Sequence, residues 1–177
     1  MLIRGQKQYC SRTDYLEKQE CCIIKRREPD SKWDFDLRGE GDMTTSNMVA
    51  TIPCDIQKTW GIMTAVENYH MWRSGVSRVE VIDEQQFVEY TKDGYATTIT
   101  LAAVEPYSRL VFATENNHTK GHWTCVLAAR GGETELNITA SVMSKKLTLR
   151  PVGQSIFERS YIKKEQEQFV KDLNSLC

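Results

Sequence analysis

The sequence predicts an α+β fold in which a curled antiparallel sheet of about six or seven strands wraps around a long C-terminal helix. The tail, from about residue 156 to 176, repeats apolar residues at helical spacing. The part before it alternates apolar and polar residues between tight-turn dipeptides, and a short helix or helix pair follows the first strand. A twisted sheet of this size curls, and only the terminal helix is long enough to cover its concave face.

The first strand is predicted over Ser46–Cys54, where Pro53 closes it because proline cannot donate a hydrogen bond to a sheet. Asp55 then stands where a helix N-cap is expected. A helix from about 56 to 67 follows, because apolar residues recur on one of its faces. These residues are Ile56, Trp60, Met63 and Val66. Tyr69–Trp72 continues the chain as a short irregular or helical piece.

Six consecutive strands come next, and tight turns separate them. Asp93-Gly94 and Gly131-Gly132 each lie between alternating runs, which is a strong mark of a β-hairpin. Consecutive hairpins give a meander of antiparallel strands. The predicted strands are Val79–Ile82, Phe87–Thr91, Tyr95–Ala103, Leu110–Glu115, His122–Ala129 and Thr134–Met143, with a polar loop over Asn116–Gly121.

The C-terminal helix begins with a capping-box pattern, in which Ser155 stands three residues before Glu158. Its apolar face holds four residues, and Gln166 fills the one gap between them. The four are Ile162, Phe169, Leu173 and Leu176. A helix of this length spans about 30 Å, which is enough to cross a small sheet.

A change in composition near Met43 predicts two parts, a charged N-terminal extension over residues 1–42 and a domain over residues 43–177. The extension holds nine Lys or Arg and nine Asp or Glu among 42 residues. It has little apolar surface to offset chain entropy, so we expect it to be poorly ordered. A short strand or helix packed on the domain is the alternative.

The codons for Gly39–Asp42 form a purine-rich tract directly before the ATG of Met43, as a bacterial ribosome-binding site would. One hypothesis is therefore that Met43 is the natural start and that residues 1–42 are not part of the natural protein. The other is a genuine regulatory or interaction arm. The intact mass of the protein from its native host decides between them.

Composition narrows the classes of function. A net charge of −1 argues against a nucleic-acid binder, and no apolar run reaches the roughly 20 residues that span a bilayer. The N-terminus has no apolar signal core, so a cytoplasmic location is expected. The six cysteines lack CxxC spacing, which predicts free thiols in a reducing compartment and no metal site.

Apolar strand faces are predicted to point toward the helix, because the opposite faces carry polar residues such as Arg130 and Glu135. The inward residues are Ile99, Leu101, Leu110, Phe112, Trp123, Cys125, Leu127, Leu136, Ile138 and Ala140. Aromatic side chains that can line a space between sheet and helix are the candidate ligand-binding residues. They are Trp60, Trp72, Tyr95, Phe112, Trp123, Phe157 and Tyr161. For Trp60 and Trp72 the competing interpretation is core packing.

Polar groups that enter such a space are harder to assign. Thr98, Thr100 and Glu89 are candidates together with the two tyrosines, although a surface position is favoured for each. Glu89 would be informative if buried, because desolvation raises a carboxyl pKa and suits the group to acid–base chemistry. His122 is a weak candidate for a general base. No catalytic motif is present, so the catalytic residues are unknown, and no cofactor or metal is required.

Five short motifs, in order along residues 46–177, resemble the START-like (SRPBCC) superfamily with the helix-grip fold, and within it the polyketide cyclase/dehydrase and lipid-transport group. The motifs are Ala50–Trp60, Asn68–Trp72, Glu105–Leu110, Gly121–Thr124 and Gly132–Leu136. The resemblance implies a cavity between the curled sheet and the C-terminal helix. None of the five motifs is catalytic, so it implies little about chemistry.

The expected function is binding, with transport or sequestration as its purpose, of a small hydrophobic ligand such as a lipid, polyketide or isoprenoid. The first alternative is a cyclase or dehydratase that uses the same cavity without metal or cofactor. The second is a protein-interaction domain similar to chaperone activators. Nucleic acid and stable membrane insertion are not expected, and both a monomer and a homodimer stay open.

Overall fold

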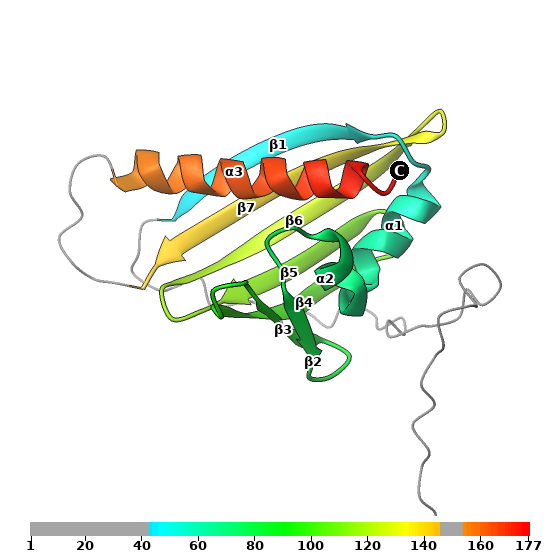
Figure 1. Ribbon diagram of the computed structural model, residues 1–177. Helices are drawn as coiled ribbons and strands as arrows, with labels where there is room; N and C mark the ends of the chain where they lie inside the picture. Colours follow the sequence, from blue (N-terminus) through cyan, green and yellow to red (C-terminus); the bar gives the residue numbers. More distant parts are fainter. Residues whose placement is uncertain (1–42, 146–153) are drawn as a thin grey trace, which may run out of the picture.

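The computed structural model describes residues 43–145 and the backbone of 154–177, with the side chains of the last helix from Arg159 onward. A seven-stranded antiparallel sheet curls around the C-terminal helix, as predicted (Figure 1). The elements are β1 (Thr44–Ile52), α1 (Ile56–Thr64), the 3-10 helix η1 (Val66–Asn68), α2 (Tyr69–Trp72), β2 (Arg78–Val81), β3 (Gln86–Tyr90), β4 (Ala96–Glu105), β5 (Arg109–Glu115), β6 (Thr119–Arg130), β7 (Glu133–Ser144) and α3 (Gln154–Asn174).

The strand order is β1-β7-β6-β5-β4-β3-β2, so the six later strands form a meander and β1 pairs with the last of them. Gly94, Gly131 and Gly132 have positive φ angles, which is why these turns contain glycine. The loop before β6 is shorter than the predicted Asn116–Gly121. The Asn116 carboxamide oxygen accepts hydrogen bonds from the backbone amides of His118 and Thr119, and this compact turn lets β6 begin at Thr119.

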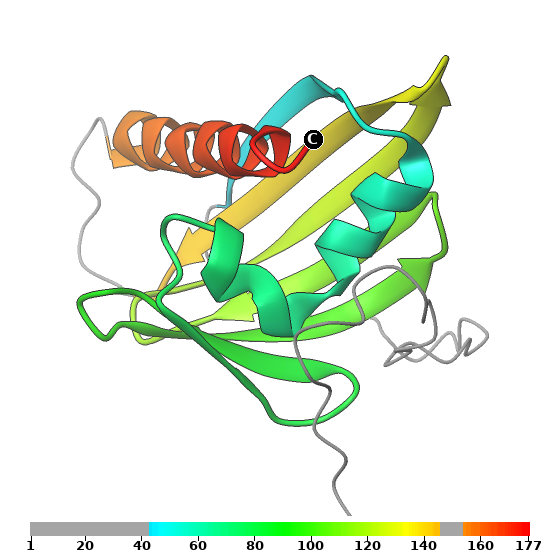
Figure 2. The same cartoon turned by 45° about the vertical axis from the view of Figure 1, so that its right-hand side comes forward.

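Helix α1 begins as predicted but ends earlier. The Asp55 carboxylate accepts hydrogen bonds from the amides of Gln57 and Lys58 and caps the helix. Ala65 leaves the helical conformation at φ −81° and ψ 68°, so α1 stops at Thr64 instead of near residue 67. The chain continues through η1 and α2 along the same side of the sheet (Figure 2).

Helix α3 lies along β1 and β7 on the concave side of the sheet (Figures 1 and 2). The predicted face is correct for Ile162, Phe169 and Leu173, which are buried, whereas Leu176 is 40% exposed because the helix ends at Asn174. Gln166, the polar residue in the gap, is fully buried. It is bonded to Ser46 of β1 and to a backbone carbonyl of β7, so it ties the helix to two strands.

The prediction of free thiols is wrong for two of the cysteines. Cys54, which lies two residues after the end of β1, and Cys177 form a disulfide with a Cα–Cα distance of 5.4 Å. Cys125 is a buried free thiol, and burial raises its pKa to about 12, so it stays protonated. The other three cysteines lie outside the described residues, as do residues 1–42.

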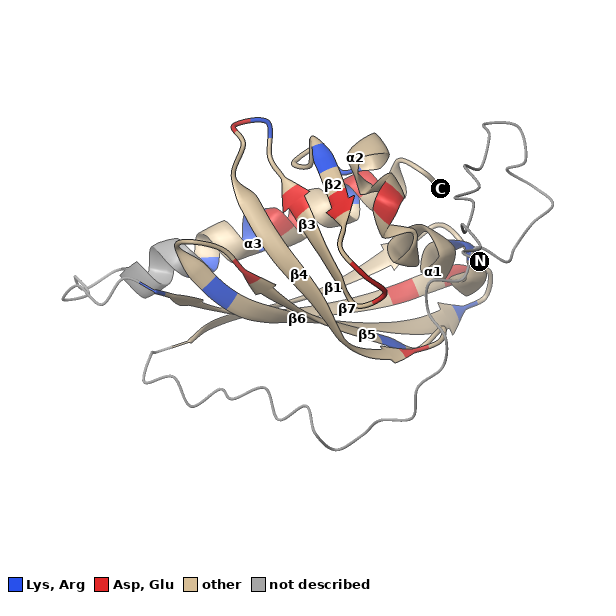
Figure 3. Ribbon diagram, turned by 90° about the horizontal axis from the view of Figure 1, so that it is seen from below, with Lys and Arg blue, Asp and Glu red and all other residues tan. Residues whose placement is uncertain are grey.

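The inward strand faces are confirmed. Most of the predicted inward residues are buried, and the remaining three are partly buried and pack on the core. The core has two clusters, one beneath α1 and α3 and a smaller one around Val76, Phe87 and Ile99. Acidic and basic residues are interspersed along the described ribbon (Figure 3), and none of its helices is apolar and long enough for a transmembrane span.

Candidate functional site

Three aromatic side chains lie on the concave side, next to the core, without being fully buried: Trp72, Phe112 and Trp123. We call them the aromatic wall. Phe112 of β5 and Trp123 of β6 are directly opposite in register, and their rings stack at 6.3 Å with planes 12° apart. Trp72 and Phe112 pack against both core clusters. The wall therefore offers apolar surface where the two clusters meet.

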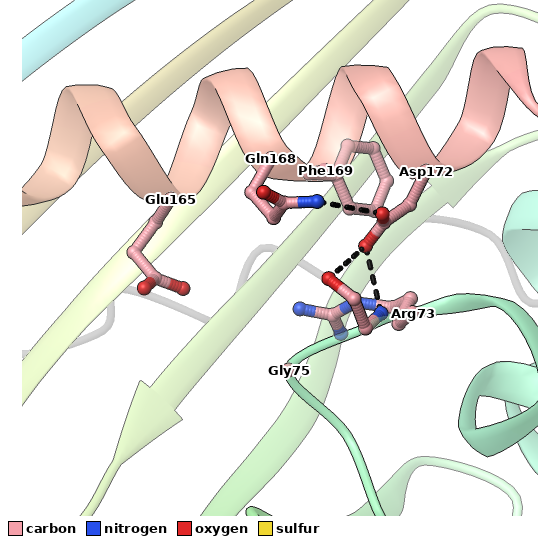
Figure 4. A pocket seen from close by; sticks show the side chains of 7 residues that line it. Arg73, Gly75, Glu165, Gln168, Phe169 and Asp172 are labelled. Atoms are coloured by element: carbon pink, nitrogen blue, oxygen red, sulfur yellow. Dashed lines mark hydrogen bonds between the residues drawn. The ribbon is translucent and has the colours of Figure 1, made fainter.

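A cavity of about 150 Å³ lies between α3 and the loop from α2 to β2 (Figure 4). Its lining is mostly polar, so we call it the polar cavity: Arg73, Ser74, Gly75, Glu165, Gln168, Phe169 and Asp172. The Phe169 ring is 5.7 Å from that of Trp72, measured between centroids. This contact joins the polar cavity to the aromatic wall.

Glu89 of β3 and Arg73 form an ion pair beside this cavity. The expected surface position of Glu89 is wrong, because its side chain is only 11% exposed. The alternation of β3 explains this: Phe87 points into the core, so Glu89, two residues later, points to the same side. Burial raises the pKa of Glu89, although the Arg73 charge opposes that rise.

The Arg73 guanidinium is held by rings as well as by charge. Its central carbon lies 5.2 Å from the ring centroid of Tyr69 and 5.5 Å from that of Phe169. The Tyr69 hydroxyl donates a hydrogen bond to the carbonyl of Met63, and burial raises the pKa of this phenol. Arg73 thereby connects α2, β3 and α3 at one point.

Asp172 of α3 fixes the loop that closes the cavity. Its Oδ2 accepts hydrogen bonds from the amide and the hydroxyl of Ser74, at 2.8 and 2.9 Å. Its Oδ1 accepts one from Gln168 Nε2 at 2.7 Å (Figure 4). The wall of the cavity on the α3 side is therefore built by the last turns of the helix.

The structure brings together only part of the aromatic set predicted from the sequence. Trp60 belongs to α1 and is buried in the core, with its ring centroid 5.8 Å from that of Tyr107. Tyr95 is 62% exposed in the turn just before β4, where its ring contacts His118. Tyr161 of α3 is 60% exposed. The side chain of Phe157 lies outside the described residues.

Other polar candidates are directed away from the concave side. Thr98 and Thr100 flank the buried Ile99 and therefore point to the opposite face of β4. His122 alternates with the inward Trp123 in the same way, and burial lowers its pKa. In the described part of the chain, no group of three His, Cys, Asp or Glu side chains is placed to hold a metal ion.

Sequence patterns did not assign four residues of this region to a site: Tyr69, Arg73, Phe169 and Asp172. One signal was available: Glu165, Phe169 and Asp172 recur at spacings of four and three, which places them on one side of a helix. The role of Arg73 had no local signal, because its partners lie on three separate elements.

Comparison with known proteins agrees with this fold. The chain matches the family described as polyketide cyclase / dehydrase and lipid transport over residues 43–175. A search of curated proteins gave no match. A START superfamily protein from Mycobacterium smegmatis has a similar structure, with a TM-score of 0.65 and 11% identity over 74% of this chain and 94% of that chain.

Two further solved structures are similar. A conserved protein from Geobacillus kaustophilus has a TM-score of 0.64 and 15% identity, over 74% of this chain and 93% of that chain. The Zhui aromatase/cyclase from Streptomyces sp. R1128 has a TM-score of 0.60 and 12% identity, over 76% of this chain and 93% of that chain. At these identities the likeness establishes the helix-grip fold alone.

Proposed function

The chain belongs to the polyketide cyclase / dehydrase and lipid transport family, and from this premise we propose that it binds a small hydrophobic molecule between the curled sheet and α3. A lipid, a polyketide or an isoprenoid would suit such a site. The apolar body of the ligand would lie on the aromatic wall, and the polar cavity would receive its polar end.

The observation that carries the proposal is the incomplete burial of Phe112 and Trp123. Both rings point to the concave side, where large apolar groups are normally covered. A bound molecule would remove their remaining surface from water and gain about 25 cal/mol for each Å² of apolar area. Arg73 supplies guanidinium donors at the edge of the same region, and the carboxylate of Glu165 lines the same cavity.

Replacing Phe112 with Ala is expected to weaken binding of the neutral apolar dye Nile red about tenfold or more, because it removes a large ring from the wall. Fluorescence titration measures the dissociation constant. Val126→Ala is the matched control, since Val126 lies on the opposite face and is 43% exposed. Equal affinity in all three proteins, or no binding to the wild type, would contradict the proposal. Native mass spectrometry of gently purified protein then identifies the natural ligand class.

The buried carboxyl of Glu89 favours one second candidate, an enzyme that removes a proton from the carbon next to a carbonyl group. A cyclase or dehydratase acting on a polyketide-like substrate needs such a base. Glu89 lies on the concave side and Arg73 beside it could stabilise an enolate oxygen.

This candidate predicts exchange of the α-protons of a hydrophobic β-diketone in deuterated water, measured by NMR. Only ionised Glu89 accepts a proton. Because its pKa is raised above the ordinary value of 4.5, the rate should increase with pH through a midpoint above 4.5. Glu89→Gln should abolish this increase, whereas Glu133→Gln, an exposed change at the first residue of β7, should keep it. A rate equal to the buffer rate at every pH would exclude the enzyme.

The third alternative, a protein-interaction domain, gains no support from the convex face. Among the described residues of β1, β6 and β7, Val49 and Val126 are the exposed large hydrophobics, and Asn137 separates them in register. A cytoplasmic location, a homodimer and the separation of residues 1–42 from a functional unit at 43–177 stay predictions. The disulfide removes the argument from free thiols for a cytoplasmic location. Fractionation of the native host would test that location.

A further inference from the structure

The Cys54–Cys177 disulfide joins a fixed point of the domain to the end of α3. Cys54 is 5% exposed, and its carbonyl accepts hydrogen bonds from the hydroxyls of Thr134, at 2.9 Å, and Thr59, at 3.5 Å. Both threonines are fully buried. The segment around Cys54 is therefore anchored to α1 and β7 by contacts that do not involve the disulfide bond.

The other end of the bond is held much less firmly. After Leu173 the helix ends in a loose turn, in which the amides of Leu176 and Cys177 bond to the carbonyls three residues before them, at 3.1 and 3.3 Å. Ser175, Leu176 and Cys177 are exposed. The chain end lies beside the start of α1 (Figure 1), and the disulfide is the covalent link that keeps it there.

The part of α3 after the Gln166 anchor contains three of the four helix residues that line the polar cavity, and Glu165 is the fourth. Gln168, Phe169 and Asp172 are the three, and Asp172 also holds the α2–β2 loop through Ser74. Movement of these last turns would therefore release both sides of the cavity together. The buried Ile162 and Gln166 would keep the rest of the helix in place.

We propose that the Cys54–Cys177 disulfide is a redox-sensitive latch on the ligand site, and that its reduction speeds the exchange of a bound hydrophobic molecule. Faster exchange of a bound molecule rests on the proposed binding function. Local loosening of the last turns of α3 on reduction does not depend on that function.

The reductant would be a dithiol. One of its thiolates attacks the sulfur of Cys177, which is the exposed partner, and the S–S bond breaks. The electron pair leaves on the sulfur of Cys54, which takes up a proton. The second thiolate of the reductant then displaces the sulfur of Cys177, which is protonated in turn. Two electrons and two protons reach the protein, and the dithiol becomes a cyclic disulfide.

Amide hydrogen exchange tests the latch directly, on wild-type protein with and without dithiothreitol. Reduction is expected to speed exchange at residues 168–177 and 73–75 about tenfold or more, with the central strands β5–β7 unchanged. Cys177→Ser keeps every other cysteine and lacks the bond, so it should exchange fast in both conditions. Equal exchange at 168–177 in oxidised and reduced wild type, or an equal increase throughout β5–β7, would overturn the latch.

Ligand release is measured by stopped flow, with Nile red as the probe and phosphatidylcholine vesicles as the acceptor. Release should be about tenfold faster from reduced wild type and from Cys177→Ser than from oxidised wild type. Unchanged release despite faster amide exchange would refute control of the ligand site. If Nile red does not bind the oxidised protein at all, the proposed function fails, while amide exchange still decides whether the latch exists.

Discussion

Replacing Gln166 with Ala is expected to lower the free energy of unfolding by about 3–5 kcal/mol, because it creates a cavity and leaves buried polar groups without partners. The Gln166 carboxamide oxygen accepts a hydrogen bond from the Ser46 hydroxyl at 2.8 Å. Its Nε2 donates to the carbonyls of Ile138 and Ser46, at 3.1 and 3.3 Å. Urea unfolding followed by circular dichroism measures the loss.

Two further variants separate the causes. Gln166→Leu keeps most of the side-chain volume and removes the hydrogen bonds, so it should lose less than the alanine variant but still more than about 1 kcal/mol. Lys164→Ala, two residues away on the exposed side, should change stability by about 0.5 kcal/mol or less. A leucine variant as stable as the wild type would show that packing alone holds α3 on the sheet.

Gly121→Ala should lower the free energy of unfolding by about 3 kcal/mol, and this is the second large effect. A Cβ at Gly121 would lie 2.3 Å from the backbone oxygen of Ser141 and 3.0 Å from the Cα of Val142. Backbone atoms of a central strand cannot move aside as a flexible side chain can, so β6 and β7 would have to separate. Thermal and urea unfolding both measure the loss.

Gly61→Ala is the matched control for this change. Gly61 lies inside α1, and a Cβ there meets no atom within 4 Å. Alanine favours the helical state, so this variant should gain about 0.5–1 kcal/mol. If Gly121→Ala were also neutral or stabilising, the close approach of β6 to β7 would not be a feature of the folded protein in solution.

Much of the fold could be predicted from local patterns. Alternation at period two identified the inward faces of β4–β7, and glycine turns identified the hairpins, because both depend on neighbouring residues in the chain. The face of α3 was predictable for the same reason. Gln166 stood out as the polar residue in an apolar stripe, although its partners in β1 and β7 are set by the packing of the helix.

The candidate site was less predictable, because its contacts join distant segments. The charged neighbours of Glu89 suggested exposure, but its burial depends on Arg73, which comes from the turn after α2. The disulfide joins residues 123 positions apart, and no local spacing indicates such a pair. The sequence pattern grouped Tyr95 with the aromatic residues of the ligand site, but the hairpin geometry places it beside His118 at the surface.

The covalent ring closed by Cys54 and Cys177 contains nearly the whole domain, and this governs how the molecule responds to mechanical force. A pull between Met43 and Cys177 can straighten only the segment ahead of Cys54, about 40 Å of chain at full extension. The strands after Cys54 carry none of the pulling force, because the force passes through the Cys54–Cys177 disulfide bond. A protein unfoldase that reaches this part of the chain would meet a covalently closed loop between Cys54 and Cys177, and would have to pass two chain segments at once.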